Sequence, residues 1–176
     1  LFGVVSSIIG SQAGDTAALS EMFGSLGIYA AIIAGGCLIQ GLGVLPAIFV
    51  TLTRKNPFKF MNQMGTGLLT TFCTASSAAS LPITIPDIQK KTGVSQKIAA
   101  FCLPLGNTIN MNGTALFECV TAIFVAQVYG IDLTLGQQIV IVMTSLLAAI
   151  GAAGIPLAGL VMLAVVLNAV GLPLEG

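Results

Sequence analysis

The stretch Gly106-Asn-Thr-Ile-Asn-Met-Asn-Gly-Thr-Ala-Leu-Phe-Glu118 decides the fold, because it places amides, hydroxyls and a carboxyl group inside a long apolar run. Asn110, Thr114 and Glu118 are four residues apart, so on a helix they fall along one face. We expect the two glycines of the stretch to interrupt that helix and to free backbone carbonyls beside these side chains. Polar groups at membrane depth usually face a bundle interior or a water-filled cavity. The stretch is therefore a candidate site.

The composition is that of a membrane protein. Of 176 residues, 56% are hydrophobic and 7% are charged, and the mean hydropathy is +1.02. Soluble domains carry about 25% charged residues. The formal net charge of zero gives no argument for nucleic acid, and the lack of histidine excludes His-based catalysis and His-ligated metals. An intramembrane hydrolase using Ser76 or Ser77 is a poor alternative, because no Lys or Asp stands beside these serines in sequence. We therefore expect no enzyme.

We predict an all-α membrane protein with two re-entrant helical hairpins of inverted topology. The chain has no initiating methionine and no signal-peptide pattern, so it is interpreted as a fragment of a longer protein. The expected organisation is the end of a transmembrane helix with an outer loop (1–21), a transmembrane helix (22–55), a first hairpin (56–92), a broken transmembrane helix with the ion-binding motif (93–131) and a second hairpin (132–176).

The basic residues favour the first hairpin. All six of them flank the uncharged stretch 60–86: Arg54, Lys55, Lys59, Lys90, Lys91 and Lys97. A single span would leave half of them on the wrong side under the positive-inside tendency, whereas a hairpin leaves all six on the cytoplasmic side. We expect a non-helical tip over 74–83, which is rich in small and hydroxyl residues and contains Pro82. Such a tip is tolerated at membrane depth where it lines a cavity or is buried in protein.

A second hairpin is predicted from length and glycine content. The uncharged stretch 133–174 is too long for one ordinary span at ~1.5 Å per residue, and its middle, 149–159, is glycine-rich and contains Pro156. The segments 79–83 and 153–157 share the pattern alanine, small, aliphatic, proline, aliphatic. Interrupted hydrophobic segments in weak inverted repeats are typical of the binding site of a secondary transporter.

Three motifs together resemble the glutamate transporter family of sodium- or proton-coupled dicarboxylate and neutral amino-acid carriers. They are Thr74-Ala-Ser-Ser-Ala-Ala-Ser-Leu-Pro82, Thr108-Ile-Asn-Met-Asn-Gly-Thr114 and Ala149-Ile-Gly-Ala-Ala-Gly-Ile-Pro156. The resemblance implies an elevator transporter that is a homotrimer at full length and holds its substrate between two hairpin tips. It also implies that the last helix of the transport domain, which reads an acidic side chain, is missing from this fragment.

The resemblance implies a set of substrate-binding residues and a set of sodium ligands. The substrate set is Ser76, Ser77, Thr114, Gly154, Ile155, Pro156 and Gly159. The sodium set is Gly106, Thr108, Asn110, Met111, Asn112, Ala149, Ile150 and Ala152, and oxygen atoms of an unwound helix suit such a hard cation. The alternatives are helix capping by the two serines and an interhelical amide bond for Asn110.

Two positions affect ion coupling. Asn112 stands where the common family motif has aspartate, so a negative charge is lost at one sodium site. Glu118 is the only acidic residue inside an apolar run, and a carboxyl group that titrates as access alternates can carry a proton. Family members with glutamate here couple to protons, so the resemblance implies that Glu118 is the proton carrier. The alternative is a protonated glutamate in a static hydrogen bond.

The expected function is secondary active symport of a small amino acid, glutamate or aspartate by preference, with sodium and a proton. Sodium would be a co-transported ligand rather than a resident cofactor. The alternatives are a neutral amino-acid or dicarboxylate carrier of the same family, and an ion channel or non-transporting membrane scaffold. The expected location is a cell membrane, with the bacterial inner membrane preferred.

Overall fold

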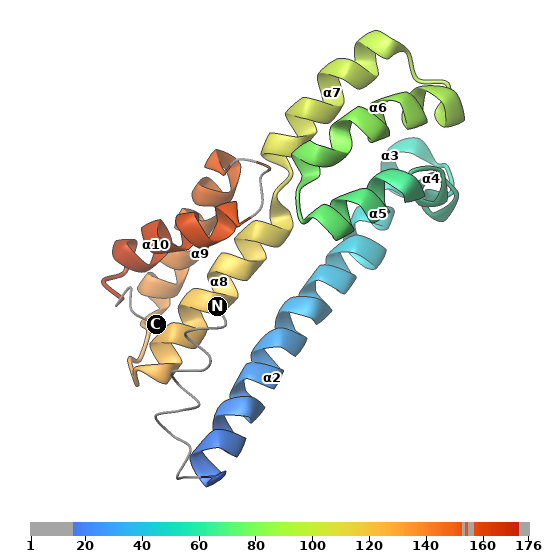
Figure 1. Ribbon diagram of the computed structural model, residues 1–176. Coiled ribbons are helices and arrows are strands. Elements are labelled where there is room, and N and C mark those ends of the chain that lie inside the picture. Colours follow the sequence, from blue (N-terminus) through green and yellow to red (C-terminus); the bar gives the residue numbers. More distant parts are fainter. Residues whose placement is uncertain (1–15, 153, 155–156, 173–176) are drawn as a thin grey trace.

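The computed structural model describes residues 16–152, 154 and 157–172, and their side chains from residue 23 onward. These residues form helices and no strands, which confirms the all-α prediction for the part described (Figure 1). The elements are α2 (Thr16–Leu38), the π-helix η1 (Ile39–Val44), α3 (Leu45–Thr53), α4 (Pro57–Gln63), α5 (Gly65–Thr74), α6 (Ser77–Thr92), α7 (Gln96–Ile109), α8 (Asn112–Val128), α9 (Leu135–Gly151) and α10 (Ala158–Ala169).

Two segments are long and apolar enough to cross a membrane. Phe23–Thr53 has 31 residues and runs through α2, η1 and α3, and Gln96–Val128 has 33 residues and comprises α7 and α8. At ~1.5 Å per residue, either exceeds the ~30 Å hydrocarbon core. Helix α2 begins at Thr16, whereas we expected a loop up to residue 21. The sequence there is polar but contains alanine and leucine, which are strong helix formers, so the helix extends through it.

The first hairpin consists of α5 and α6, which lie side by side (Figure 1). They are joined through Ala75, which adopts the left-handed conformation at φ 49°, and Ser76, the N-cap of α6. The expected non-helical tip over 74–83 is therefore wrong in extent, since α6 is helical from Ser77 and includes Pro82. Serine side chains explain the difference: the Ser76 Oγ accepts the Ala79 N–H at 3.2 Å, which caps the helix where the sequence favoured a loop.

The five-residue pattern shared by 79–83 and 153–157 does not mark equivalent positions. Residues 79–83 lie inside α6, whereas Gly154 is non-helical and Leu157 is the left-handed N-cap of α10, at φ 64°. In the first hairpin the left-handed residue is Ala75, which precedes the shared pattern. The similarity therefore reflects composition near both tips and not a common local structure.

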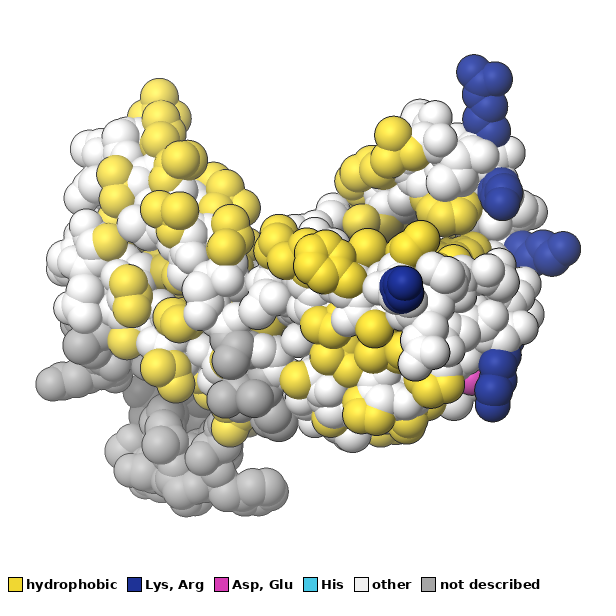
Figure 2. Space-filling model, turned by 90° about the horizontal axis from the view of Figure 1, so that it is seen from above, with side chains coloured by type: hydrophobic (Ala, Val, Ile, Leu, Met, Phe, Trp, Pro, Cys, Tyr) yellow, Lys and Arg dark blue, Asp and Glu magenta, His cyan; other side chains and the backbone are white. Residues whose placement is uncertain are grey.

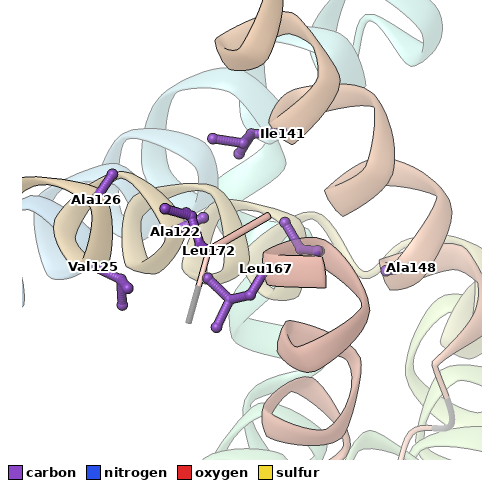
Figure 3. Packing of buried hydrophobic residues seen from close by; sticks show 8 residues of the cluster. Ala122, Val125, Ala126, Ile141, Ala148, Leu167 and Leu172 are labelled. Atoms are coloured by element: carbon purple, nitrogen blue, oxygen red, sulfur yellow. The ribbon is translucent and has the colours of Figure 1, made fainter. Parts of the chain in front are cut away.

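The core lies where α8, α9 and α10 pack against one another. One face of α8 is buried, and a cluster of buried apolar residues joins it to α9 and α10 (Figure 3): Ala122, Val125, Ala126, Ile141, Ala148, Val166, Leu167 and Leu172. Helix α2 also packs on α8, where the Tyr29 hydroxyl lies 2.8 Å from the Thr121 Oγ1. Helix α8 is thus held from two sides, and its first turn is fixed beside the tips of both hairpins.

Candidate functional site

The broken helix is the element on which the site is built. Helix α7 ends at Ile109 and α8 begins at Asn112, and the two residues between them, Asn110 and Met111, have φ and ψ of −93°, 52° and −93°, 46°. We expected Gly106 and Gly113 to interrupt the helix, but both lie within helices. A glycine costs a helix only about 1 kcal/mol relative to alanine, and tertiary packing overrides a preference of that size.

The break exposes opposite ends of two helices at one place. The last turn of α7 leaves carbonyl groups without their usual partners, and the first turn of α8 leaves N–H groups in the same condition. One carbonyl is occupied, because Gly106 accepts the Asn110 N–H at 3.0 Å. The carbonyl groups of Asn107, Thr108 and Ile109 belong to the same last turn of α7. A cation is favoured at the α7 end and an anion at the α8 end.

The two hairpin tips meet at the carbonyl group of Gly154. The Ser76 Oγ donates to this oxygen at 2.7 Å and the Ala78 N–H donates to it at 3.1 Å. Ser76 therefore caps α6 and also joins the tips, and it is only 6% exposed. Its hydroxyl is occupied by these bonds, so the structure supports the capping alternative for Ser76 more directly than a contact with substrate.

A cavity of about 330 Å³, which we call the tip cavity, lies between the tips and the start of α8. It brings together four residues expected to bind substrate, Ser77, Thr114, Gly154 and Gly159, and two expected to bind sodium. Its lining residues are Ala75, Ser77, Asn110, Met111, Gly113, Thr114, Gly154, Leu157, Ala158 and Gly159. The expected substrate residues Ile155 and Pro156 lie outside the described residues.

Three helices begin at the tip cavity. Its lining includes first-turn residues of α6 (Ser77), α8 (Gly113 and Thr114) and α10 (Ala158 and Gly159). None of these helices has an acidic residue in its first turn. Helix N-termini carry unsatisfied N–H groups and a partial positive charge. The cavity is therefore suited to a ligand with more than one negatively charged group.

A second cavity, of about 650 Å³, lies on the other side of the break, between α2, η1, α3 and α8, and we call it the η1 cavity. Its polar side chains include three amides, from Gln40, Asn110 and Asn112. No carboxylate is among its described lining residues. Asn110 lines both cavities, whereas Asn112 lines only the η1 cavity. The structure thus separates Asn112 from the expected substrate residues, with Asn110 between them.

The other expected sodium ligands do not line the tip cavity. The Thr108 hydroxyl donates to the carbonyls of Pro104 and Leu105 at 3.0 and 3.2 Å. Ala149 and Ala152 are 3% and 1% exposed and lie at the end of α9, where the Ala152 N–H donates to the Ala149 carbonyl at 3.3 Å. Ile150 is 51% exposed. Their role as carbonyl ligands stays a prediction.

Glu118 lies on the buried face of α8 with no exposed surface. Both of its carboxyl oxygens lack a hydrogen-bond partner among the described residues. The static hydrogen bond that we considered as an alternative is therefore not seen in the described part of the chain. Ser145 of α9 is equally buried and its hydroxyl is also unpartnered there. An unpaired carboxyl in such a place is stable only in its neutral form.

Asn107 is a candidate residue to which the sequence assigned no role. Its Oδ1 is buried and has no hydrogen-bond partner among the described residues. Its amide lies against Gly154, because a Cβ atom added there would be 2.7 Å from Asn107 Nδ2 and 2.9 Å from Oδ1. The available signal was an amide in an apolar helix, one turn before Asn110. Its contact with the second tip could not be read from that spacing.

The comparisons with known proteins agree with this geometry. The model of the sodium:dicarboxylate symporter family matches residues 1–176. The chain is 48% identical over 155 residues to excitatory amino acid transporter 3 of Mus musculus. This alignment covers 88% of the chain and 30% of that protein. It is 43% identical over 176 residues to an excitatory amino acid transporter of Caenorhabditis elegans, at 99% and 34% coverage. The chain therefore spans about a third of the length of these relatives.

Proposed function

This chain belongs to the sodium:dicarboxylate symporter family, and from that premise we propose that it is part of a carrier that moves an acidic amino acid together with sodium and a proton. One observation carries the proposal, namely the tip cavity in which the first turns of α6, α8 and α10 meet. A substrate such as aspartate has two carboxylates, and three helix N-termini provide separate positions for them. A neutral amino acid has one carboxylate and would leave part of this positive potential unused.

The side chains suggest how an acidic amino acid would be held. Ser77 is the first residue of α6, and its hydroxyl and backbone N–H would receive one carboxylate, because the next two N–H groups already bond to the Gly154 carbonyl and the Ser76 Oγ. Thr114 projects from the first turn of α8 and would donate its hydroxyl to the distal carboxylate. Gly159 leaves room beside Thr114, because a Cβ atom there would lie 3.2 Å from the Thr114 Cγ2.

Sodium would bind at the carboxyl ends of helices. The last turn of α7 and the Asn110 side chain lie at one such end, and Ala149 to Ala152 form the other, at the end of α9. Carbonyl oxygens at helix C-termini carry partial negative charge and suit a hard cation. In the η1 cavity, Asn112 offers an amide oxygen but no formal charge. We therefore propose weaker sodium binding there than at a site with a carboxylate.

Glu118 would carry the proton. It is fully buried and unpartnered among the described residues, and such burial favours the neutral form of a carboxyl group. Release of the proton would require contact with water in another conformation, and an elevator movement of the two hairpins would provide it. The bonds from Ser76 and Ala78 to Gly154 would then hold the tips together in the occluded state.

The location and the assembly of the full-length protein are part of the proposal. We propose that the full-length protein is a homotrimer in a cell membrane. The relatives reported above come from animals, so they give no support to the bacterial inner membrane that we expected. The orientation in the membrane is inferred from the basic residues, which gather at one end of the molecule (Figure 2). That end would be cytoplasmic.

The test is uptake of radiolabelled aspartate by the full-length protein in liposomes, with sodium and pH gradients imposed separately. We expect saturable, sodium-driven uptake that a pH gradient accelerates. Glu118→Gln should keep the sodium dependence and lose the response to the pH gradient. Asp87→Asn is the matched control, because it also removes a carboxyl group but at the exposed end of α6. A lack of uptake under every gradient, for aspartate and for neutral amino acids, would favour the channel or scaffold alternative.

A further inference from the structure

A further pocket lies at the basic end of the molecule, away from both cavities described above. It has a volume of about 640 Å³, which is within the range of ~300–1,000 Å³ typical of ligand sites. It is formed by the end of α3, by α4 and by the end of α6, and we call it the basic pocket. Three of the six basic residues of the chain line it: Lys55, Lys59 and Lys91.

The positive charge of this pocket is largely uncompensated. The only ion pair among the described residues joins the Lys91 Nζ to Asp87 at 2.8 Å. Lys55 and Lys59 therefore have no acidic partner in the described part of the chain. Asn56, which lies between them, uses its Oδ1 to cap α4 by accepting two backbone N–H groups, so its amide NH₂ is available to a ligand. The pocket thus offers several donors and an excess of positive charge.

One wall of the pocket is apolar and includes the end of a segment that is long and apolar enough to cross a membrane. The rings of Phe49 and Phe60 stack with their centroids 5.0 Å apart, and both line the pocket. Phe49 belongs to the membrane-spanning segment Phe23–Thr53, about one turn before its end, and the lysines follow directly after that end. We therefore expect the pocket to extend from the hydrocarbon boundary into the headgroup region.

We propose that the basic pocket binds an anionic phospholipid of the adjacent leaflet. The phosphate and any headgroup carboxylate would lie between the Lys55 and Lys59 ammonium groups. The part of the acyl chains nearest the headgroup would lie against Phe49 and Phe60. Basic pockets between transmembrane helices on the cytoplasmic side are suited to such headgroups. A water-soluble phosphate would use the lysines but would gain nothing from the phenyl wall. This inference does not depend on the proposed transport function.

The test is lipid binding to the purified full-length protein, measured by native mass spectrometry with phosphatidylserine and phosphatidylcholine. The variant Lys55→Gln/Lys59→Gln removes both unpaired lysines of the pocket. The variant Lys90→Gln/Lys97→Gln is the matched control, because it changes the net charge equally at the same end of the molecule but outside the pocket lining. At about fivefold per lysine near the surface, the first variant should bind phosphatidylserine roughly 25-fold more weakly, and the control should change binding less than threefold.

Three results would overturn the proposal. Equal weakening by both double variants would indicate diffuse attraction to the basic end and no defined pocket. Equal binding of phosphatidylcholine by the unchanged protein would remove the charge argument, and this measurement needs no variant to fold. Displacement of phosphatidylserine by glycerol phosphate at a similar concentration would assign the pocket to a soluble phosphate compound.

Discussion

Replacement of Gly154 by alanine tests whether the contact between the hairpin tips matters for closure. An added Cβ atom would lie 2.7 and 2.9 Å from the two terminal atoms of Asn107 and 2.9 Å from the Ser77 Oγ. Ordinary contacts begin at 3.4 Å, so the tip must move by about 0.5 to 0.7 Å or the side chains must turn away.

The size of the effect follows from the cost of overpacking. An extra methyl group in a packed site costs about 1–3 kcal/mol, and ~1.4 kcal/mol changes an equilibrium constant tenfold. Because the conflict exists only when the tips are together, it falls on the closed state. If substrate binds with closure, the apparent Kd for aspartate should rise by about 5- to 140-fold. The lower part of this range is favoured, because the conflicting atoms lie at the ends of side chains that can rotate.

The assay is sodium-dependent binding of labelled aspartate to the purified full-length protein. Gly136→Ala is the matched control, because it lies in the same hairpin, outside the proposed sodium segment, and an added Cβ would meet only the Thr134 Oγ1, at 4.0 Å. The double variant Gly154→Ala/Asn107→Ala removes two of the three conflicting atoms and should recover part of the affinity. If Gly154→Ala bound aspartate as well as Gly136→Ala does, the tip contact would have no role in closure and the reasoning would be refuted.

Two further variants test contacts outside the cavities. Tyr29→Phe removes the 2.8 Å hydrogen bond to Thr121. It should lower the stability of the full-length protein by about 0.6 kcal/mol, which is typical of interhelical hydrogen bonds in membranes. The assay is thermal unfolding, with Tyr129→Phe as the control. The hydrogen bond from Lys91 holds the pKa of Asp87 below its ordinary value. A lowered pKa contributes stability above the unfolded value of about 3.9, and this contribution is lost as pH falls through the folded value. Asp87→Asn should therefore cause a small loss of stability at pH 7 that disappears in a melting series below pH 4, and a constant difference at every pH would contradict the pairing.

Local features of the structure could be predicted from the sequence, because they depend on residues near one another in the chain. The uncharged run before Arg54 predicts a membrane-spanning helix, and Phe23–Thr53 is long and apolar enough to be one. Gly106 and Gly113 predict a broken helix, and the break lies between those glycines. Its position at Asn110 and Met111 was missed, because glycine content indicates where a helix is weak and not where packing lets it end.

Contacts between distant segments could not be predicted. The Ser76 hydroxyl bonds to the Gly154 carbonyl across 78 residues, and no periodicity within either hairpin encodes that pairing. The close approach of Gly67 in α5 to the Thr84 side chain in α6 is equally a product of packing. The η1 cavity is lined by residues of α2, η1, α3 and α8, which are far apart in the chain, so the separation of Asn112 from the substrate residues is a tertiary property. Asn112 and Thr114 belong to one sequence motif, but the motif does not show that they line different cavities.

No carboxylate is among the described lining residues of the tip cavity, and this has a consequence for coupling. A cation at the end of α7 would meet carbonyl and amide oxygens, which carry only partial charges, so its desolvation is poorly compensated by the protein alone. A bound acidic substrate would bring two full negative charges to the N-termini of α6, α8 and α10, across the same cavity. Each ligand would then raise the affinity for the other by the same factor, as linkage requires. Under the proposed function, this reciprocity couples the uptake of an acidic amino acid to sodium, and it is weaker for a substrate with a single carboxylate.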